Sequence, residues 1–282
     1  MKSTTLLRDY LQIQLLKLKK SDVQEQKNKS EMIIQHYLKI SKADLYFKDI
    51  SLDQKSIIDL NNMFNSLLVN TPVQHIIEET FFYENSFITP PGIFIPRPET
   101  ELLVDSAIDF ISSTTRKLRI LDLCTGSGCI VLSIAKKFPE NDFIGIDKSS
   151  FAIQVAKKNQ KLLKIDSVEF LKADMFNFEI NNIDLLLCNP PYLAKKEMKN
   201  LEESVKNHDP ESALTDYDDG TSYYKFLISN FTSFINKNGI MLIELPFSPV
   251  ANDIELFNKK FNANNSTFLK DLEGKNRVIK IY

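Results

Sequence analysis

The 282-residue sequence predicts an α/β fold, with a mostly parallel sheet in its larger part and a small all-helical domain at its N-terminus. Its first 71 residues contain neither glycine nor proline, the two residues that destabilise a helix most. Five of the eleven prolines then fall between Pro72 and Pro98. From about residue 100 onward, continuously apolar runs alternate with helical patterns, which indicates a parallel sheet covered on both faces.

Residues 1–75 are the predicted helical domain. Apolar side chains recur at helical spacing from Leu6 onward, so a first helix is expected there. We expect Ser30 to cap a second helix, and Ser41 to form a capping box with Asp44 at the start of a third. A fourth helix is expected to begin near Asp53.

Residues 76–98 are predicted to form a β-hairpin that joins the two domains. Its strands are the β-rich runs at 80–83 and 92–95, connected through Asn85 and the Pro90-Pro91 pair. An irregular proline-rich linker is the alternative interpretation.

Residues 99–282 are the predicted α/β domain. Strands are expected at 118–123, 143–147, 168–171, 183–188 and 240–244, around Phe268, and at 278–282. Helices are expected at 129–138, 150–163, 223–235 and near 254–261. The last two strands are close in sequence, so they should form an antiparallel hairpin at the C-terminal end of the sheet.

Composition limits the class of protein. Hydrophobic residues make up 43% of the chain and charged residues 26%, as in soluble globular proteins, and no apolar run approaches the ~20 residues of a membrane helix. The N-terminus lacks the pattern of a signal peptide. The chain has 35 basic and 37 acidic residues, so we do not expect an extended basic surface that binds nucleic acid. Cys124, Cys129 and Cys188 have neither disulfide nor zinc spacing. We therefore expect a cytoplasmic monomer with no metal site, no membrane association and no direct nucleic-acid partner.

The segment 122–128, Asp-Leu-Cys-Thr-Gly-Ser-Gly, lies between a predicted strand and a predicted helix. At this position open α/β sheets bind ligands, and the two glycines remove Cβ atoms that would hold a ligand away from the turn. Asp147, at the end of the next strand, can accept hydrogen bonds from both hydroxyls of a ribose. A nucleoside-containing cofactor is therefore predicted, bound by Asp147 and by the run Cys124, Thr125, Gly126, Ser127 and Gly128. NAD enzymes share this geometry, although their fingerprint has a small residue where this chain has Val131, and a purely structural turn is a further alternative.

Asp174 and Met175 follow the third predicted strand. The carboxylate is a candidate hydrogen-bond acceptor for an adenine amino group, and the Met175 side chain is a candidate to pack on the ring. A lone aspartate at a strand end is also typical of a helix cap or a turn.

The segment Asn189-Pro190-Pro191-Tyr192 directly follows the apolar strand that ends at Cys188. Two successive prolines fix φ and lack N–H groups, so the loop should be stiff with its carbonyls unpaired. The Asn189 side-chain oxygen and the Pro190 carbonyl can then both accept hydrogen bonds from one NH₂ group, and Tyr192 offers an aromatic wall for a planar group. We predict Asn189, Pro190 and Tyr192 as catalytic residues and Asn189, Pro190, Pro191 and Tyr192 as the substrate-binding segment. Asn189 is also a candidate cofactor contact.

These motifs together resemble the class-I S-adenosylmethionine methyltransferases that methylate NH₂ groups on planar systems, namely adenine-N6 and cytosine-N4 DNA enzymes and glutamine-N5 protein enzymes. Further segments are similar to the release factor glutamine N5-methyltransferases (the PrmC/HemK family): 71–76, 94–101, 209–214 with Asp219-Gly220, and 271–274 with Arg277-Val278. The resemblance covers nearly the whole chain.

The resemblance implies a Rossmann-like class-I methyltransferase domain with a seven-stranded sheet, and S-adenosyl-L-methionine as the cofactor. The implied substrate is the glutamine of the Gly-Gly-Gln loop in class 1 peptide chain release factors, whose methylation modulates translation termination. Two departures from the family pattern stand out. Cys124 occupies a position where glycine is common, which a small side chain tolerates at negative φ, and Glu244-Leu245-Pro246 replaces a more usual Glu-x-Gly.

Three other functions stay open at this point. A DNA amino-methyltransferase would share the Asn189 motif, but the near-neutral charge and the lack of an obvious target-recognition domain count against it. A non-catalytic module that binds release factors or ribosomes would not need the intact Asn189 motif. A methyltransferase for ribosomal proteins or small molecules carries a similar motif and is the nearest alternative.

Overall fold

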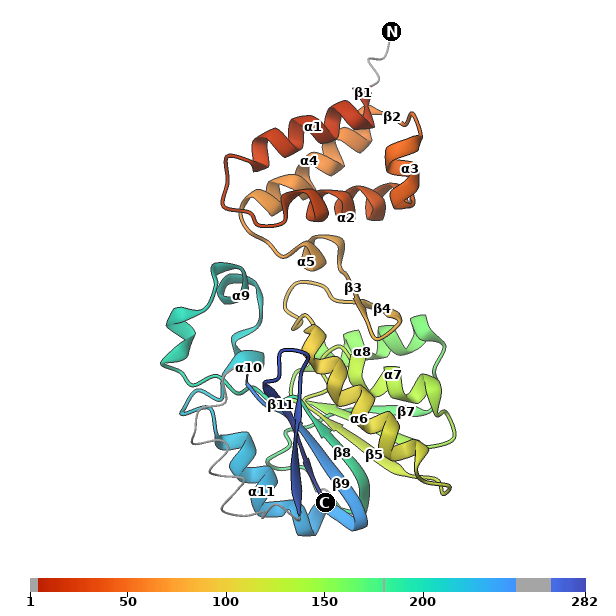
Figure 1. Ribbon diagram of the computed structural model, residues 1–282, viewed down its shortest axis with the longest axis vertical. Coiled ribbons are helices and arrows are strands. Elements are labelled where there is room, and N and C mark those ends of the chain that lie inside the picture. Colours follow the sequence, from red (N-terminus) through yellow and green to blue (C-terminus); the bar gives the residue numbers. More distant parts are fainter. Residues whose placement is uncertain (1–4, 180, 247–264) are drawn as a thin grey trace. The chain divides into compact units, whose positions relative to one another are not determined.

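The computed structural model describes residues 5–179, 181–246 and 265–282, which are coloured along the chain in Figure 1. The chain divides into two compact units. The smaller unit runs up to Glu79 and also includes Pro90–Gly92 and Glu202–His208. The larger unit contains Thr80–Thr89, Ile93–Leu201 and the described residues from Asp209 onward.

The smaller unit is built from short helices around one apolar core. Its N-terminal helices are α1 (Leu7–Leu18), α2 (Gln26–Leu38), α3 (Lys42–Phe47), α4 (Gln54–Leu68) and α5 (Val73–Ile77). Strand β1 (Thr5–Leu6) pairs with β2 (Ser51–Leu52), which links the residues before α1 to those before α4. Fully buried Ile33, Ile34 and Leu60 come from α2 and α4. The four predicted helices are therefore confirmed, whereas α5 was not anticipated.

The helix starts test the predicted caps. The Ser41 hydroxyl accepts the Asp44 N–H and the Asp44 carboxylate accepts the Ser41 N–H, which confirms the capping box. Asp53 caps α4 by accepting the Ser56 N–H at 2.8 Å. The predicted cap at Ser30 is wrong, because α2 begins a turn earlier at Gln26 and the Ser30 hydroxyl donates to the Gln26 carbonyl inside the helix.

The predicted hairpin is present, but its second strand was misplaced. Strand β3 (Glu79–Phe82) pairs with β4 (Asn85–Ile88), and no strand forms at 92–95. Tyr83 and Glu84 both adopt positive φ, so the chain reverses within two residues and pairs with the next segment. The apolar pattern at 92–95 reflects packing instead, since Ile93 is buried against Ala152 and Val155.

The larger unit is a seven-stranded sheet with the order β10-β11-β9-β8-β5-β6-β7. Its strands are β5 (Arg119–Leu123), β6 (Asp142–Asp147), β7 (Val168–Lys172), β8 (Ile183–Cys188), β9 (Ile235–Glu244), β10 (Ser266–Lys270) and β11 (Asn276–Ile281). Strands β5, β6, β7, β8 and β9 run parallel to one another, while β11 runs antiparallel to both β9 and β10. The predicted fold class is therefore confirmed, including the antiparallel C-terminal hairpin.

Helices cover both faces of this sheet (Figure 1). Helices α6 (Glu101–Ser112), α7 (Cys129–Lys137) and α8 (Ser150–Leu163) cover one face, and α11 (Ser222–Phe234) covers the other. The larger unit also contains α10 (Glu211–Leu214) and the 3-10 turns η1 (Pro98–Thr100) and η2 (Glu197–Asn200), whereas α9 (Glu203–His208) belongs to the smaller unit. Alternate residues of β8 enter different cores: Leu185 packs with α6, α7 and α8, whereas Leu186 packs with α11. Because both faces are buried, the strands read as continuously apolar.

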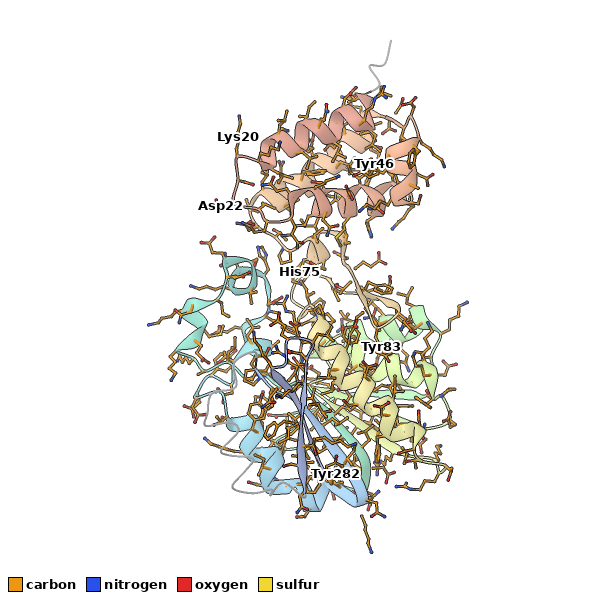
Figure 2. All side chains as sticks on the ribbon, viewed as in Figure 1. Lys20, Asp22, Tyr46, His75, Tyr83 and Tyr282 are labelled. Atoms are coloured by element: carbon orange, nitrogen blue, oxygen red, sulfur yellow. The ribbon has the colours of Figure 1, made fainter. Side chains whose placement is uncertain are left out.

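Several helical segments were not predicted. Helix α6 fills the connection before β5, and it holds the hairpin: the Tyr83 N–H donates to Glu101 and the Tyr83 hydroxyl donates to Asp105 at 2.7 Å (Tyr83 is labelled in Figure 2). The short helices α9 and α10 were expected to be loop. The helix predicted near 254–261 lies outside the described residues. In the described part of the chain, no helix combines the length and apolar character needed to cross a bilayer.

Candidate active site

Four of the predicted motifs meet at one edge of the sheet. Strands β8, β5, β6 and β7 are neighbours, all run parallel, and each has a predicted site residue at or just after its carboxyl end. In the register, Leu123 lies opposite both Cys188 and Ile146, and Asp147 lies opposite Lys172. The parallel pairing therefore brings these segments together at the carboxyl ends of the strands, within the larger unit.

The loop after β5 is fixed by hydrogen bonds on both sides. The Thr125 N–H donates to the Ile146 carbonyl at 3.0 Å, and the Thr125 hydroxyl donates to the Asp122 carboxylate at 2.6 Å. The Asp122 side chain is fully buried, and this burial raises its pKa to about 7 against the opposing hydrogen bond from Thr125. On the other side, the Gly126 N–H donates to the Asp147 carboxylate at 3.0 Å.

The two glycines of this loop are required for different reasons. Gly126 has a φ of +55°, and a Cβ there would meet nothing closer than the Cys124 carbonyl at 3.9 Å, so space is open beside its backbone. A Cβ on Gly128, at φ +79°, would lie 3.0 Å from the Phe170 ring and 3.2 Å from Ala156. The expectation that both glycines make room for a ligand is therefore wrong for Gly128, whose missing side chain makes room for the core.

Asp147 is half-buried, and each of its carboxylate oxygens accepts one backbone N–H. Oδ1 accepts from Ser149 at 2.8 Å and Oδ2 accepts from Gly126 at 3.0 Å. Burial raises the pKa of this carboxyl, while the two N–H groups act in the opposite direction. Each oxygen keeps a second lone pair for a ligand hydroxyl.

Cys124 does not have the negative φ at which a small side chain was expected to be tolerated at this position. Its φ is +58°, in the left-handed region, so the residue carries the strain that glycine would avoid. Its Sγ lies 4.0 Å from the Met175 Sδ. The thiol also acts on neighbouring Cys188, whose pKa is well above its ordinary value because of burial first and of Cys124 second.

Asp174 and Met175 lie at the same edge in different environments. The Asp174 carboxylate is exposed and accepts the Phe176 N–H at 3.1 Å, which makes a turn. The Met175 side chain is buried in the core that α11 covers. Their suggested contacts with adenine stay predictions.

Sequence reasoning missed two residues near this edge, Tyr223 and Asn159. Tyr223, on α11, has its pKa raised by burial and then by the thiols of Cys124 and Cys188 and the carboxylates of Asp174 and Asp147, so its phenol lies among the predicted site residues. Nothing in its local sequence marks it, since it belongs to an ordinary apolar helix face.

Asn159, on α8, is completely buried and contacts the loop after β5. Its Nδ2 donates to the Ser127 carbonyl at 2.9 Å and to the Ile88 carbonyl at 3.1 Å, and its Oδ1 accepts the Ile88 N–H at 2.7 Å. The one hint in the sequence was that Asn159 is a polar residue on the apolar face of a predicted helix.

The segment after β8 contains the predicted catalytic residues. Pro190 and Pro191 are buried, whereas Asn189 and Tyr192 are half-buried. The Asn189 Nδ2 donates to the Thr100 hydroxyl oxygen at 3.3 Å. Burial of the Tyr192 phenol raises its pKa.

A second loop braces this segment. The Leu193 N–H donates to the Leu214 carbonyl and the Lys195 N–H donates to the Asp218 carbonyl, both at 2.9 Å. A Cβ on Gly220, at φ +84°, would lie 2.5 Å from the Tyr192 carbonyl, so only glycine allows this approach. The sequence places Gly220 beyond the predicted catalytic segment but does not predict its contact with Tyr192.

The segment Glu244-Leu245-Pro246, which replaces a more usual Glu-x-Gly, is held by hydrogen bonds at the end of β9. Glu244, Leu245 and Pro246 are all buried. The Leu245 N–H donates to the Arg277 carbonyl at 2.7 Å, and the Tyr224 hydroxyl donates to the Glu244 carbonyl at 3.0 Å.

Comparison with known proteins identifies the family. A protein-family model described as "Methyltransferase domain" matches residues 114–279. The release factor glutamine methyltransferase of Thermodesulfovibrio yellowstonii is 38% identical over 220 residues, which cover 77% of this chain and 78% of that protein. This chain belongs to the release factor glutamine methyltransferase family. It is a methyltransferase, as the sequence resemblance implied.

A second relative agrees with this assignment, and a solved structure supports the fold. The release factor glutamine methyltransferase of Flavobacterium psychrophilum is 31% identical over 256 residues, covering 89% of each chain. The catalytic domain of hMettl16, solved with the MAT2A 3'UTR hairpin 6, matches with a TM-score of 0.56 and 15% identity, covering 83% of this chain and 85% of that one. At this identity the structural likeness supports the fold.

Proposed function

We propose that this chain transfers a methyl group from S-adenosyl-L-methionine to the side-chain nitrogen of the glutamine in the Gly-Gly-Gln loop of class 1 peptide chain release factors, and thereby modulates translation termination. The observation that carries the proposal is the segment 189–192 at the carboxyl edge of the sheet, in a chain whose relatives are named release factor glutamine methyltransferases over most of their length.

The residues at this edge fit the proposed cofactor. The open space beside the Gly126 backbone admits a ligand, and the Asp147 carboxylate beside it can accept both ribose hydroxyls. Cys124, Thr125, Gly126, Ser127, Gly128, Asp147, Asp174, Met175 and Asn189 are the residues proposed to hold it. When bound, the cofactor supplies a methyl group carried on a sulfonium.

The site must make a poor nucleophile react, because the lone pair of an amide nitrogen is delocalised. The Asn189 side-chain oxygen and the Pro190 carbonyl are proposed to accept the two N–H groups of the substrate amide, and Tyr192 to pack against its plane. This arrangement would align the nitrogen with the methyl group and favour the positive charge that develops on it. The nitrogen then loses one of its two protons to water.

The histidines are not needed as bases in this mechanism. His36 and His75 belong to the smaller unit, where His36 lies 3.1 Å from Glu79, and His208 lies on α9. The proposal therefore assigns these three histidines structural or surface roles.

We propose a separate role for each predicted domain. Residues 1–75 are proposed to hold the body of the release factor, 76–98 to connect the domains, and 99–282 to carry the chemistry in a cytoplasmic monomer. Deletion of residues 1–70 should raise KM for the whole release factor more than for a loop peptide. An equal rise for both substrates would contradict the docking role.

Asn189→Ala tests the catalytic assignment. We expect kcat for release factor methylation to fall by about 100-fold or more, since one aligned polar contact at a reacting group contributes on this scale. Asn177→Ala, which removes an exposed asparagine of the same unit, is the matched control. A near wild-type kcat in Asn189→Ala would contradict the mechanism, and efficient methylation of duplex DNA in place of release factor would favour the DNA enzyme.

A further inference from the structure

We propose that Glu244 is a positioning residue: together with Thr100, it orients the side-chain amide of Asn189 so that the amide oxygen faces the substrate. This inference rests on the proposed function, because it assumes that the Asn189 oxygen accepts a substrate N–H. It adds the side chains of Glu244, on β9, and Thr100, on η1, to the residues that are proposed to act with the segment after β8.

The strand register places Glu244 beside Asn189. Strands β8 and β9 are parallel, with Cys188 opposite Ile243, so Asn189 and Glu244 are the next residues along the two strands. Thr100 approaches from η1, and the Asn189 Nδ2 donates to its hydroxyl oxygen at 3.3 Å. Thr100 and Glu244 are only 1% and 2% exposed, so water does not compete for either side chain.

The chemistry of the cluster decides which way the amide points. A charged carboxylate only accepts hydrogen bonds, so the neighbouring amide must present its NH₂ group to it. The Thr100 hydroxyl and the Asn189 amide both stabilise the charged form of Glu244 by hydrogen bonding. With its NH₂ group held by Thr100 and Glu244, Asn189 turns its oxygen away from them, toward the proposed substrate position.

The Glu244 carboxyl makes the stability of the fold depend on pH. Burial raises the pKa of Glu244 to about 7, and its Oε2 has no hydrogen-bond partner among the described residues. A carboxyl whose folded pKa is raised stabilises the protein fully below its ordinary pKa of about 4.5, and this contribution is lost as the pH rises through about 7. Above pH 7 the fold therefore carries an incompletely paired buried charge.

Other charged and titratable groups face Glu244 from each element packed against it. Arg277 on β11 stabilises its charged form, and Glu99 on η1 opposes it. Further titratable groups near Glu244 are the phenols of Tyr192 and Tyr224 and the thiols of Cys129 and Cys188. Because the pKa of Asp122 on β5 is also raised to about 7, the pH dependence has to be assigned by mutation.

The first experiment compares Glu244→Gln with the wild type in release factor methylation. We expect kcat to fall by about 10- to 100-fold, with cofactor Kd within about 3-fold of the wild type. The wild-type kcat should rise with pH through an apparent pKa near 7, and this rise should be absent in Glu244→Gln. At pH 8 the variant should have the higher Tm, since it removes a buried charge.

A matched pair at Thr100 separates hydrogen bonding from packing. Thr100→Val keeps the shape but removes the hydroxyl, and should lower kcat by about 10-fold. Thr100→Ser keeps the hydroxyl and should restore most of that loss. Equal losses in the two variants would overturn the role of Thr100, and a wild-type kcat and pH profile in Glu244→Gln would overturn the role of Glu244.

The second measurement does not depend on catalysis. The side-chain NH₂ resonances of Asn189, assigned by their loss in Asn189→Asp, should titrate near pH 7 in the wild type and not in Glu244→Gln. Resonances that ignore pH in the wild type would overturn the positioning role even in an active enzyme. If the wild type binds S-adenosylmethionine but leaves release factors unmethylated, the proposed function fails, and this titration still decides whether Glu244 orients Asn189.

Discussion

Asp147→Asn tests the proposed cofactor site most simply. In the wild type each carboxylate oxygen accepts one backbone N–H, from Ser149 at 2.8 Å and from Gly126 at 3.0 Å, and has a lone pair left for a ribose hydroxyl. The asparagine side chain keeps one oxygen acceptor and sets its NH₂ group against one of these N–H donors. The substitution therefore removes one charge-assisted ribose bond, weakens the other and leaves an N–H opposed.

The expected loss follows from these contacts. A hydrogen bond to a charged group contributes about 1.5–3 kcal/mol, so losing one and weakening another should reduce cofactor binding by about 2–4 kcal/mol. This corresponds to a Kd for S-adenosylmethionine that is about 30- to 1,000-fold higher. Isothermal titration calorimetry with S-adenosylmethionine and with S-adenosylhomocysteine measures it directly.

A second aspartate on the same strand provides the control. Asp142 stands at the other end of β6, is exposed, and pairs at the surface with Lys117. Asp142→Asn should bind the cofactor like the wild type. A Kd for folded Asp147→Asn within about 3-fold of the wild type, or an equal loss in Asp142→Asn, would refute the reasoning about the ribose contacts.

Three further predictions concern stability, measured by urea unfolding. Gly145→Ala should lower the free energy of unfolding by about 1–3 kcal/mol, because its Cβ would lie 2.6 Å from the Phe170 ring, and Phe170→Leu in the same chain should recover part of that loss; additive effects would contradict the contact. Cys124→Gly should be more stable than Cys124→Ala by about 1 kcal/mol, because only glycine relieves φ +58°, and a less stable glycine variant would contradict the strain. Burial acts to raise the pKa of Asp184, but hydrogen bonds, led by that from Arg116 at 2.8 Å, lower this pKa overall. Asp184 therefore stabilises the fold fully above its ordinary pKa near 4, and this contribution is lost as the pH falls through the lowered pKa. Asp184→Asn should therefore be less stable than the wild type at pH 7 by about 1–3 kcal/mol, with the difference shrinking in acid; a difference independent of pH would contradict the ionic role.

Local patterns were sufficient to predict most of the sheet. Its strands are apolar on both faces, so their sequences are continuous and easy to delimit, and the segment 183–188 was placed with its observed bounds. The second strand of the hairpin was misplaced because the run at 92–95 is rich in β-formers, whereas the reversal at Tyr83 and Glu84 brings Asn85–Ile88 into the pairing. Both residues have left-handed φ without being glycine, which leaves no mark in the sequence.

The candidate site was predictable where a motif follows a strand, and less so elsewhere. Parallel pairing brings the ends of β5, β6, β7 and β8 together whatever their separation in sequence. Tyr223 reaches the same edge from α11 through packing, which local sequence does not encode. Gly128 shows the converse, since its place in a motif suggested a ligand where the structure shows core packing.

Mass spectrometry of a release factor tests the central claim most directly. Unmethylated class 1 release factor is incubated with this protein and S-adenosylmethionine, and the peptide that contains the Gly-Gly-Gln loop is sequenced by fragmentation. The account predicts a single added methyl group on the side-chain nitrogen of that glutamine, formed about 100-fold or more slowly by Asn189→Ala than by the wild type. An unmodified glutamine after incubation with a protein that binds the cofactor, or a methyl group on another residue, would contradict it.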